Sequence, residues 1–175
     1  MSPKMLKDGV KRKKFIAKKR KKSKLVAKQR KKNPNAEELE KELRNIENFG
    51  GIFASTQLKD IIILKYPVIF LVIVKNHWIV LYLDKFTIEV YDSLMNICDY
   101  NEVLQFIRNN LFCKELKLFP KVQADDNLDC AFYATFFIKA KSKKMGFEKL
   151  LSLFNCNFEQ NSKMVRAGFN ENAYY

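Results

Sequence analysis

The chain of 175 residues is long enough for one domain with a hydrophobic core and too short for two domains of ordinary size. Hydrophobic residues make up 47% of it and aromatic residues 13%, which excludes a wholly disordered chain. The net charge of +14 is unevenly distributed, since residues 1–32 contain 16 Lys and Arg and a single acid, Asp8. The rest of the chain is nearly neutral, with 17 basic and 18 acidic residues. We therefore predict a basic tail, residues 1–34, followed by one folded domain, residues 35–175.

The number and spacing of the cysteines and the length of the apolar segments argue against several other classes of protein. The four cysteines are widely spaced, form no Cys-x-x-Cys pair and are accompanied by one histidine, which argues against a zinc site. We expect free thiols in a reducing, intracellular compartment. No apolar segment follows the basic start, so we expect no signal peptide. The most apolar stretch, residues 66–74, has nine residues, against the roughly 20 that span a bilayer, and therefore predicts a core strand and no membrane association.

The first elements in chain order are the basic tail and a short helix. Blocks of like charge repel one another, so residues 4–32 should be disordered when free. In residues 36–47, Leu39, Leu43 and Ile46 are spaced by four and three residues, which is typical of an amphipathic helix. Asn35 is a suitable N-terminal cap for this helix, and acidic residues fill its first turn.

The next segments predict a small β-meander. Residues 49–53 indicate a turn that carries apolar residues. Residues 68–74, 78–83 and 87–91 are rich in β-branched and aromatic side chains and are separated by short turns. This pattern predicts three consecutive antiparallel strands.

The second half of the domain adds helices and one strand. Residues 101–111 have helical spacing, and residues 116–119 indicate a short strand that Pro120 ends. Residues 128–140 and 147–154 are apolar and predict two more helices, the first of them buried. We expect an α+β fold in which a small, mostly antiparallel sheet packs against helix 128–140.

Four residues together favour cysteine protease chemistry, which needs a thiolate, an imidazole, a group that orients the imidazole and donors for the oxyanion. His77 starts one predicted strand and Asp92 ends the next, so the two should be neighbours in an antiparallel meander. Cys130 opens the apolar helix, where free N–H groups and the helix dipole favour a thiolate and can bind an oxyanion. Gln123, in the polar loop before Cys130, is a candidate second oxyanion donor.

Each of these residues also has a purely structural interpretation. A lone histidine beside Trp78 can be a satisfied core residue, and Asp92 before Ser93 can be a turn residue. A cysteine in an apolar helix is often a packing residue, and Gln123 alone carries little information. The ordered combination of the four is what favours a catalytic site.

The order of these residues resembles that of the adenovirus endopeptidase family of cysteine proteases and of its relatives, the Ulp/SUMO-type deconjugating proteases. The matching motifs are Asn76-His77-Trp78, Val90-Tyr91-Asp92-Ser93 and Gln123 followed, after six residues, by Cys130. Residues 49–53 also resemble the family's N-terminal Phe-x-Gly-x-Phe segment. Ala131 replaces the glycine that usually follows the nucleophile, and helical backbone angles accommodate alanine.

The resemblance implies that His77, Asp92 and Cys130 are catalytic, that Gln123 is the oxyanion donor and that the buried helix carries the nucleophile. It implies no metal and no other cofactor for the chemistry, although the adenovirus enzyme uses DNA and a short viral peptide as activators. Cys113 lies about where that enzyme has the cysteine that forms a disulfide with its activating peptide.

The resemblance also implies the substrate class. We expect cleavage of capsid or core precursor proteins of a virus or virus-like element during virion maturation. Deconjugation of SUMO- or ubiquitin-like proteins is the alternative, and an inactive protease fold that binds DNA in the virion is a third.

The basic tail predicts sequence-independent binding to DNA phosphates, or a nuclear localisation signal. Its single aromatic residue, Phe15, argues against binding by stacking on bases. A tail that only aids solubility is the alternative. Together with the resemblance, a DNA-binding tail favours a virion-maturation protease of the virion and host nucleus over a cellular deconjugating protease. We expect a monomer. The residues of the three basic blocks are Lys11, Arg12, Lys13, Lys14, Lys18, Lys19, Arg20, Lys21, Lys22, Arg30, Lys31 and Lys32.

Overall fold

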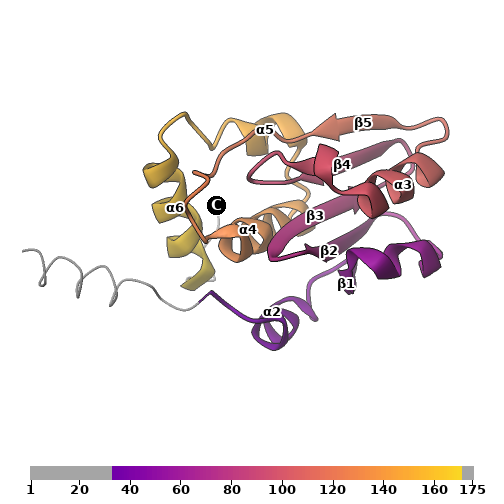
Figure 1. The fold of residues 1–175 in the computed structure, drawn as a ribbon, viewed down its shortest axis with the longest axis horizontal. Coiled ribbons are helices and arrows are strands. Elements are labelled where there is room, and N and C mark those ends of the chain that lie inside the picture. Colours follow the sequence, from indigo (N-terminus) through magenta and orange to yellow (C-terminus); the bar gives the residue numbers. More distant parts are fainter. Residues whose placement is uncertain (1–32, 171–175) are drawn as a thin grey trace, which may run out of the picture. The chain divides into compact units, whose positions relative to one another are not determined.

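A five-stranded mixed sheet organises the domain, and its strands lie side by side in chain order (Figure 1). The computed structural model describes residues 33–170, so the predicted basic tail lies outside the described residues except at its last two positions. The described chain from Pro34 onward belongs to one compact unit. The strands are β1 (Phe49–Ala54), β2 (Val68–Val74), β3 (His77–Leu83), β4 (Thr87–Tyr91) and β5 (Glu115–Leu118).

The predicted meander is present at the centre of this sheet. Strands β2, β3 and β4 pair antiparallel, with Val74 opposite His77 and Val80 opposite Tyr91. The two edge strands, β1 and β5, pair parallel with β2 and β4. The sheet is therefore mixed rather than mostly antiparallel, because each edge strand is joined to its neighbour by a long crossover instead of a tight turn.

The segment predicted as a turn at residues 49–53 is strand β1, so that prediction was wrong. Its glycines serve close packing: a Cβ atom on Gly50 would lie 2.5 Å from a ring carbon of Phe70 on β2. Gly51 has a φ of 126°, a backbone angle that favours glycine, and the register with β2 shifts between Phe49 and Gly51. Glycine runs indicate turns in sequence, but here they let an edge strand bend and approach its neighbour.

The helices follow the predicted pattern with shifted ends. Helices α2 (Ala36–Leu43), α3 (Asn101–Asn110), α4 (Cys130–Ser142) and α5 (Phe147–Leu151) match four predictions within a few residues. Asn35 caps α2 as expected, in a capping box with Glu38. Two short 3₁₀ helices, η1 (Ser55–Asp60) and η2 (Ile97–Asp99), were not predicted, and neither was the C-terminal helix α6 (Phe158–Asn170).

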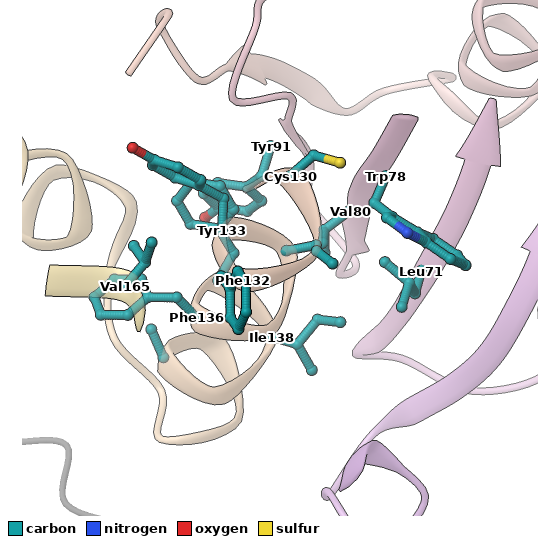
Figure 2. Packing of buried hydrophobic residues seen from close by; sticks show 14 of the residues in the cluster. Leu71, Trp78, Val80, Tyr91, Cys130, Phe132, Tyr133, Phe136, Ile138 and Val165 are labelled. Carbon is teal, nitrogen blue, oxygen red and sulfur yellow. The ribbon is translucent and has the colours of Figure 1, made fainter. Parts of the chain in front are cut away.

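Side chains alternate across the sheet and build one core on each face. Leu71, Trp78, Val80 and Tyr91 share one core with helix α4, which is buried along almost its whole length (Figure 2). On the other face, a second core joins the sheet to α3 and η1; its members include Val72, Ile79, Leu81, Leu58 and Phe106. The two layers of helices can be followed on either side of the strands in Figure 1.

This alternation determines where the first residues of β3 lie. Alternate residues of a strand point to the same face, so His77 lies on the α3 face with Ile79 and Leu81. Trp78 lies on the α4 face. Residues at this end of the sheet can therefore meet groups from both helical layers. Within residues 33–170, no helix is both long enough and apolar enough to span a membrane.

Candidate active site

His77 and Asp92 meet at one end of the sheet. His77 is the first residue of β3, after a turn in which Lys75 has a φ of 55°, and Asp92 directly follows β4. The His77 Nε2 and Asp92 Oδ1 atoms lie 2.7 Å apart, and both side chains are buried. The contact that strand pairing predicted is thus present.

Asp92 is held in place by the chain that follows it. Its Oδ1 atom also accepts a hydrogen bond from the Leu94 N–H at 3.0 Å, and its Oδ2 atom accepts one from the Asn96 N–H at 2.7 Å. Met95, between these donors, has a φ of 58°, which turns the chain back toward the carboxylate. Because both oxygens are engaged, the carboxylate has little freedom to rotate away from His77.

Cys130 approaches the same imidazole from the opposite face of the sheet. It is the first residue of α4, and its side chain lies close enough to His77 to raise the pKa of the imidazole. Since Asp92 occupies Nε2, the ring nitrogen that remains for the thiol is Nδ1. Cys130 is 7% exposed, and in Figure 2 its sulfur points away from the aromatic side chains of α4 toward the side on which Trp78 lies. The imidazole of His77 therefore has the Asp92 carboxylate as its hydrogen-bond partner and the Cys130 side chain as a neighbour.

The charges around the ring favour its protonated form. Burial is the largest single influence and lowers the pKa of His77, but the interactions of the ring with Asp92 and with the Cys130 side chain outweigh it. The net effect raises the pKa of His77 from 6.5 to about 9. An imidazolium beside the thiol is therefore favoured at neutral pH.

Gln123 is buried, and both ends of its side-chain amide are engaged. Its Oε1 accepts a hydrogen bond from Ser93 Oγ at 2.7 Å, and its Nε2 donates to the Asn127 carbonyl at 2.5 Å. The Ser93 carbonyl in turn accepts the backbone N–H groups of Val122 and Gln123, each at 3.0 Å. Because Nε2 carries two hydrogens, one N–H of Gln123 is left beyond the bond to Asn127.

The start of α4 provides a second N–H group, besides that of Gln123, that can donate a hydrogen bond. Within the described part of the chain, no hydrogen bond uses the backbone N–H of Cys130. Asp129 is the N-cap residue, and its carbonyl accepts from the N–H groups of Phe132 and Tyr133. The arrangement thus leaves an N–H of a helix N-terminus free beside the thiol.

The loop between β5 and α4 is fixed by helix α6, which the sequence did not predict. Arg166 makes a bidentate contact with the buried carboxylate of Asp129, with Nε and Oδ2 at 2.7 Å. Asn161 donates to the Val122 carbonyl at 3.0 Å, and the side chain of Asn127 donates to Ser162 at 2.7 Å. These contacts bracket the segment that carries Gln123 and leads into Cys130.

Tyr100 is a further residue of this site that the sequence did not indicate. Its ring centroid lies 6.4 Å from that of His77, with the planes inclined by 35°. Burial, followed by the nearby charge of Asp92, raises the pKa of Tyr100 to about 12, and the Cys130 side chain adds to this effect. No periodicity marks this position, because Tyr100 lies between η2 and α3 rather than within a regular element.

The other predicted site residues lie elsewhere. Cys113 is exposed, with a φ of 57°, in the connection between α3 and β5. Since Thr87 pairs with Glu115, this connection lies at the end of β4 opposite Asp92. The twelve basic residues predicted to bind DNA all lie outside the described residues.

Two further findings complete the description of the site. Among residues 33–170, no group of three or more His, Cys, Asp or Glu side chains is arranged to hold a metal ion. No protein-family model matches the sequence, and no curated protein matches it significantly.

The contact between Arg166 and Asp129 leads to a stability prediction. Arg166→Met leaves a buried carboxylate unpaired, and we expect a loss of about 2 kcal/mol in unfolding free energy, less than the full cost of a buried pair because the arginine is one-third exposed. Denaturant unfolding of the full chain measures this. Lys163→Met, on the same helix, breaks an exposed ion pair with Glu159 and should leave the midpoint of denaturant unfolding unchanged. Equal effects of the two substitutions would contradict the prediction.

The single histidine allows a direct test of the site's electrostatics. NMR of the protein with isotope-labelled histidine should give a titration midpoint near 9. Asp92→Asn removes the negative charge beside the ring, so the effect of burial gains weight and the midpoint should fall markedly. Because the folded-state pKa is raised, the stability that this group contributes is complete below pH 6.5 and is lost as the pH rises through about 9. A wild-type midpoint near 6.5 would contradict this description.

Proposed function

We propose that this chain is a cysteine endopeptidase in which Cys130 is the nucleophile, His77 the acid–base group and Asp92 the residue that orients the imidazole. The observation that carries the proposal is the buried His77–Asp92 pair, with atoms 2.7 Å apart, beside the Cys130 side chain at the start of α4. Thiol, imidazole and carboxylate in this order are the groups that nucleophilic acyl transfer requires.

The proposed reaction has two stages. The Cys130 thiolate attacks the carbonyl carbon of the scissile peptide bond, and the C–N bond then breaks as His77 gives its proton to the leaving amine. This leaves a thioester. A water molecule then attacks the thioester carbon, and His77 takes a proton from that water. The C–S bond breaks, the carboxylic acid product leaves, and the Cys130 thiolate is restored. The raised pKa of His77, about 9, supports the protonated partner that the first stage needs at neutral pH.

The oxyanion of each tetrahedral intermediate would be bound by two donors. The backbone N–H of Cys130 is one, and the remaining N–H of the Gln123 amide is the other. The bonds from Gln123 to Ser93 and Asn127 support this role, because a donor fixed before reaction costs no reorganisation in the transition state.

The substrate class follows from the resemblance to adenovirus-type endopeptidases. We propose that the enzyme cleaves capsid or core precursor proteins of a virus or virus-like element, acting in the virion and host nucleus. The basic blocks of residues 1–32 support this assignment, because they would hold the enzyme on packaged DNA. The nearly neutral remainder of the chain makes the tail the principal DNA contact.

Thiol reactivity tests the assignment of Cys130 without knowledge of the cleavage sequence. At pH 6 to 7, iodoacetamide should alkylate the buried Cys130 at least tenfold faster than the exposed Cys98, Cys113 and Cys156, because only Cys130 has an imidazolium partner. Peptide mass spectrometry of the full chain measures all four rates together. His77→Ala should remove the preference, and an unreactive Cys130 would refute the proposed mechanism.

Cleavage of a proteome-derived peptide library then measures how much each of the four site residues contributes to catalysis. Cys130→Ala and His77→Ala should each reduce cleavage at least 10⁴-fold, and Asp92→Asn should reduce it less. Gln123→Ala should cost about 10²–10³-fold in turnover, which is typical of one oxyanion donor. If the enzyme instead processes only ubiquitin-like proteins with Gly-Gly tails, it is a deconjugating protease.

Deleting residues 1–32 separates DNA binding from chemistry. The deletion removes 16 basic residues and one acid, so affinity for DNA duplexes should largely vanish, while the full chain should bind unrelated duplexes equally. Fluorescence anisotropy should show the affinity of the full chain falling roughly 10³-fold between 50 and 200 mM salt if six or more phosphates are contacted. Cleavage of short peptides should continue in the deletion variant. Unchanged DNA binding after the deletion would refute the role of the tail.

A further inference from the structure

A groove of about 520 Å³ with polar side chains on its walls lies between η1 and α3, on the face of the sheet opposite α4. Its floor is apolar and includes Leu58 and Phe106, which belong to the core on that face. The walls carry hydroxyl and side-chain amide groups from both elements. The polar wall residues are Ser55, Thr56, Asn101, Gln105, Asn109 and Asn110.

The groove begins beside the candidate active site. Ala54, Ile73 and Trp78 lie in one row across β1, β2 and β3, and strands are about 4.8 Å apart. Ser55, at one end of the groove, is therefore about 10 Å from the strand that carries His77. Asn101, on the other wall, directly follows Tyr100, whose ring lies 6.4 Å from that of His77.

The lining is suited to a polypeptide backbone. Lys59 and Glu102 are the charged residues among those that line the groove, one of each sign, so it has no net charge to attract nucleic acid. Side-chain amides both donate and accept hydrogen bonds, as does an extended peptide. The apolar floor offers a site for one or two side chains of such a segment, and the volume falls within the usual range for ligand sites of roughly 300–1,000 Å³.

We propose that this groove binds an extended segment of the protein substrate at a distance from the scissile bond; this inference rests on the proposed protease function. Helix α3 rises about 1.5 Å per residue, so Asn101 and Asn110 are about 13 Å apart along it. An extended chain advances about 3.3 Å per residue, so the groove accommodates about four residues. The gap of about 10 Å between Ser55 and the strand that carries His77 adds about three residues, so the groove takes substrate residues about four to seven positions from the cleaved bond, on one side of it.

A peptide-binding experiment tests this independently of catalysis. Displayed random peptides of twelve residues are selected on full-length Cys130→Ala protein, and affinities of the selected peptides are then measured for further variants in the same background. Gln105→Trp and Asn109→Trp each place a large side chain in the groove and should weaken binding at least tenfold. Gln160→Trp, an exposed position on α6, is the matched control and should bind as the parent does. Thermal unfolding verifies that each variant is folded.

The cleavage specificity of the Cys130 protein gives the second measurement. In a proteome-derived peptide library, the parent should select residues about four to seven positions from the cut on one side only, and Gln105→Trp should lose that selection. The proposal would be overturned if both tryptophan substitutions left unchanged the affinities of the selected peptides and the selection of residues distant from the cut. Selected peptides that bind in the groove without any Cys130-dependent cleavage would uphold the groove and refute the protease.

Discussion

The burial of helix α4 against the sheet is the constraint on which the rest of the structure depends. Almost every residue of α4 is inaccessible, so the helix has one possible placement, and that placement determines where its first residue, Cys130, lies. Charged contacts anchor both ends. At the C-terminal end, Lys141 pairs with the buried Glu89 of β4 at 2.9 Å, and at the N-terminal end Arg166 pairs with Asp129. Because a buried charge is costly without its partner, both contacts also exclude alternative registers of α4 on the sheet.

The site combines this rigid helix with a rigid strand end. Asp92 receives hydrogen bonds from His77 and from two backbone N–H groups, and the next residue, Ser93, binds Gln123 through both its hydroxyl and its carbonyl. One short segment after β4 therefore orients the imidazole and the candidate oxyanion donor together. A displacement of this segment would disturb both functions, so the effects of substitutions at Asp92 and Ser93 should not be independent.

Much of this could be predicted from sequence because it depends on local patterns. The β-branched runs of β2 to β4 and the acidic first turn of α2 behave as pattern and capping rules require, and antiparallel pairing brings His77 to Asp92. Strand β1 was missed because the close approach of Gly50 to Phe70 is a tertiary contact with no local signature. Helix α6 was missed because its buried face includes the polar residues Asn161 and Ser162, which bind loop carbonyls and side chains instead of packing in a hydrophobic core.

The two faces of the sheet would have different roles in the proposed protease. Helix α4 and its supports lie on one face, with the thiol, and there buried contacts such as Arg166 with Asp129 give rigidity. The other face carries His77, Tyr100 and the amide-lined groove, where exposed polar side chains can exchange water for a ligand. A substrate in that groove would reach the thiol only by crossing the end of the sheet, where His77 and Asp92 lie. Chemistry would therefore be confined to segments able to adopt an extended conformation over several residues, which selects flexible stretches of a precursor and spares its folded domains.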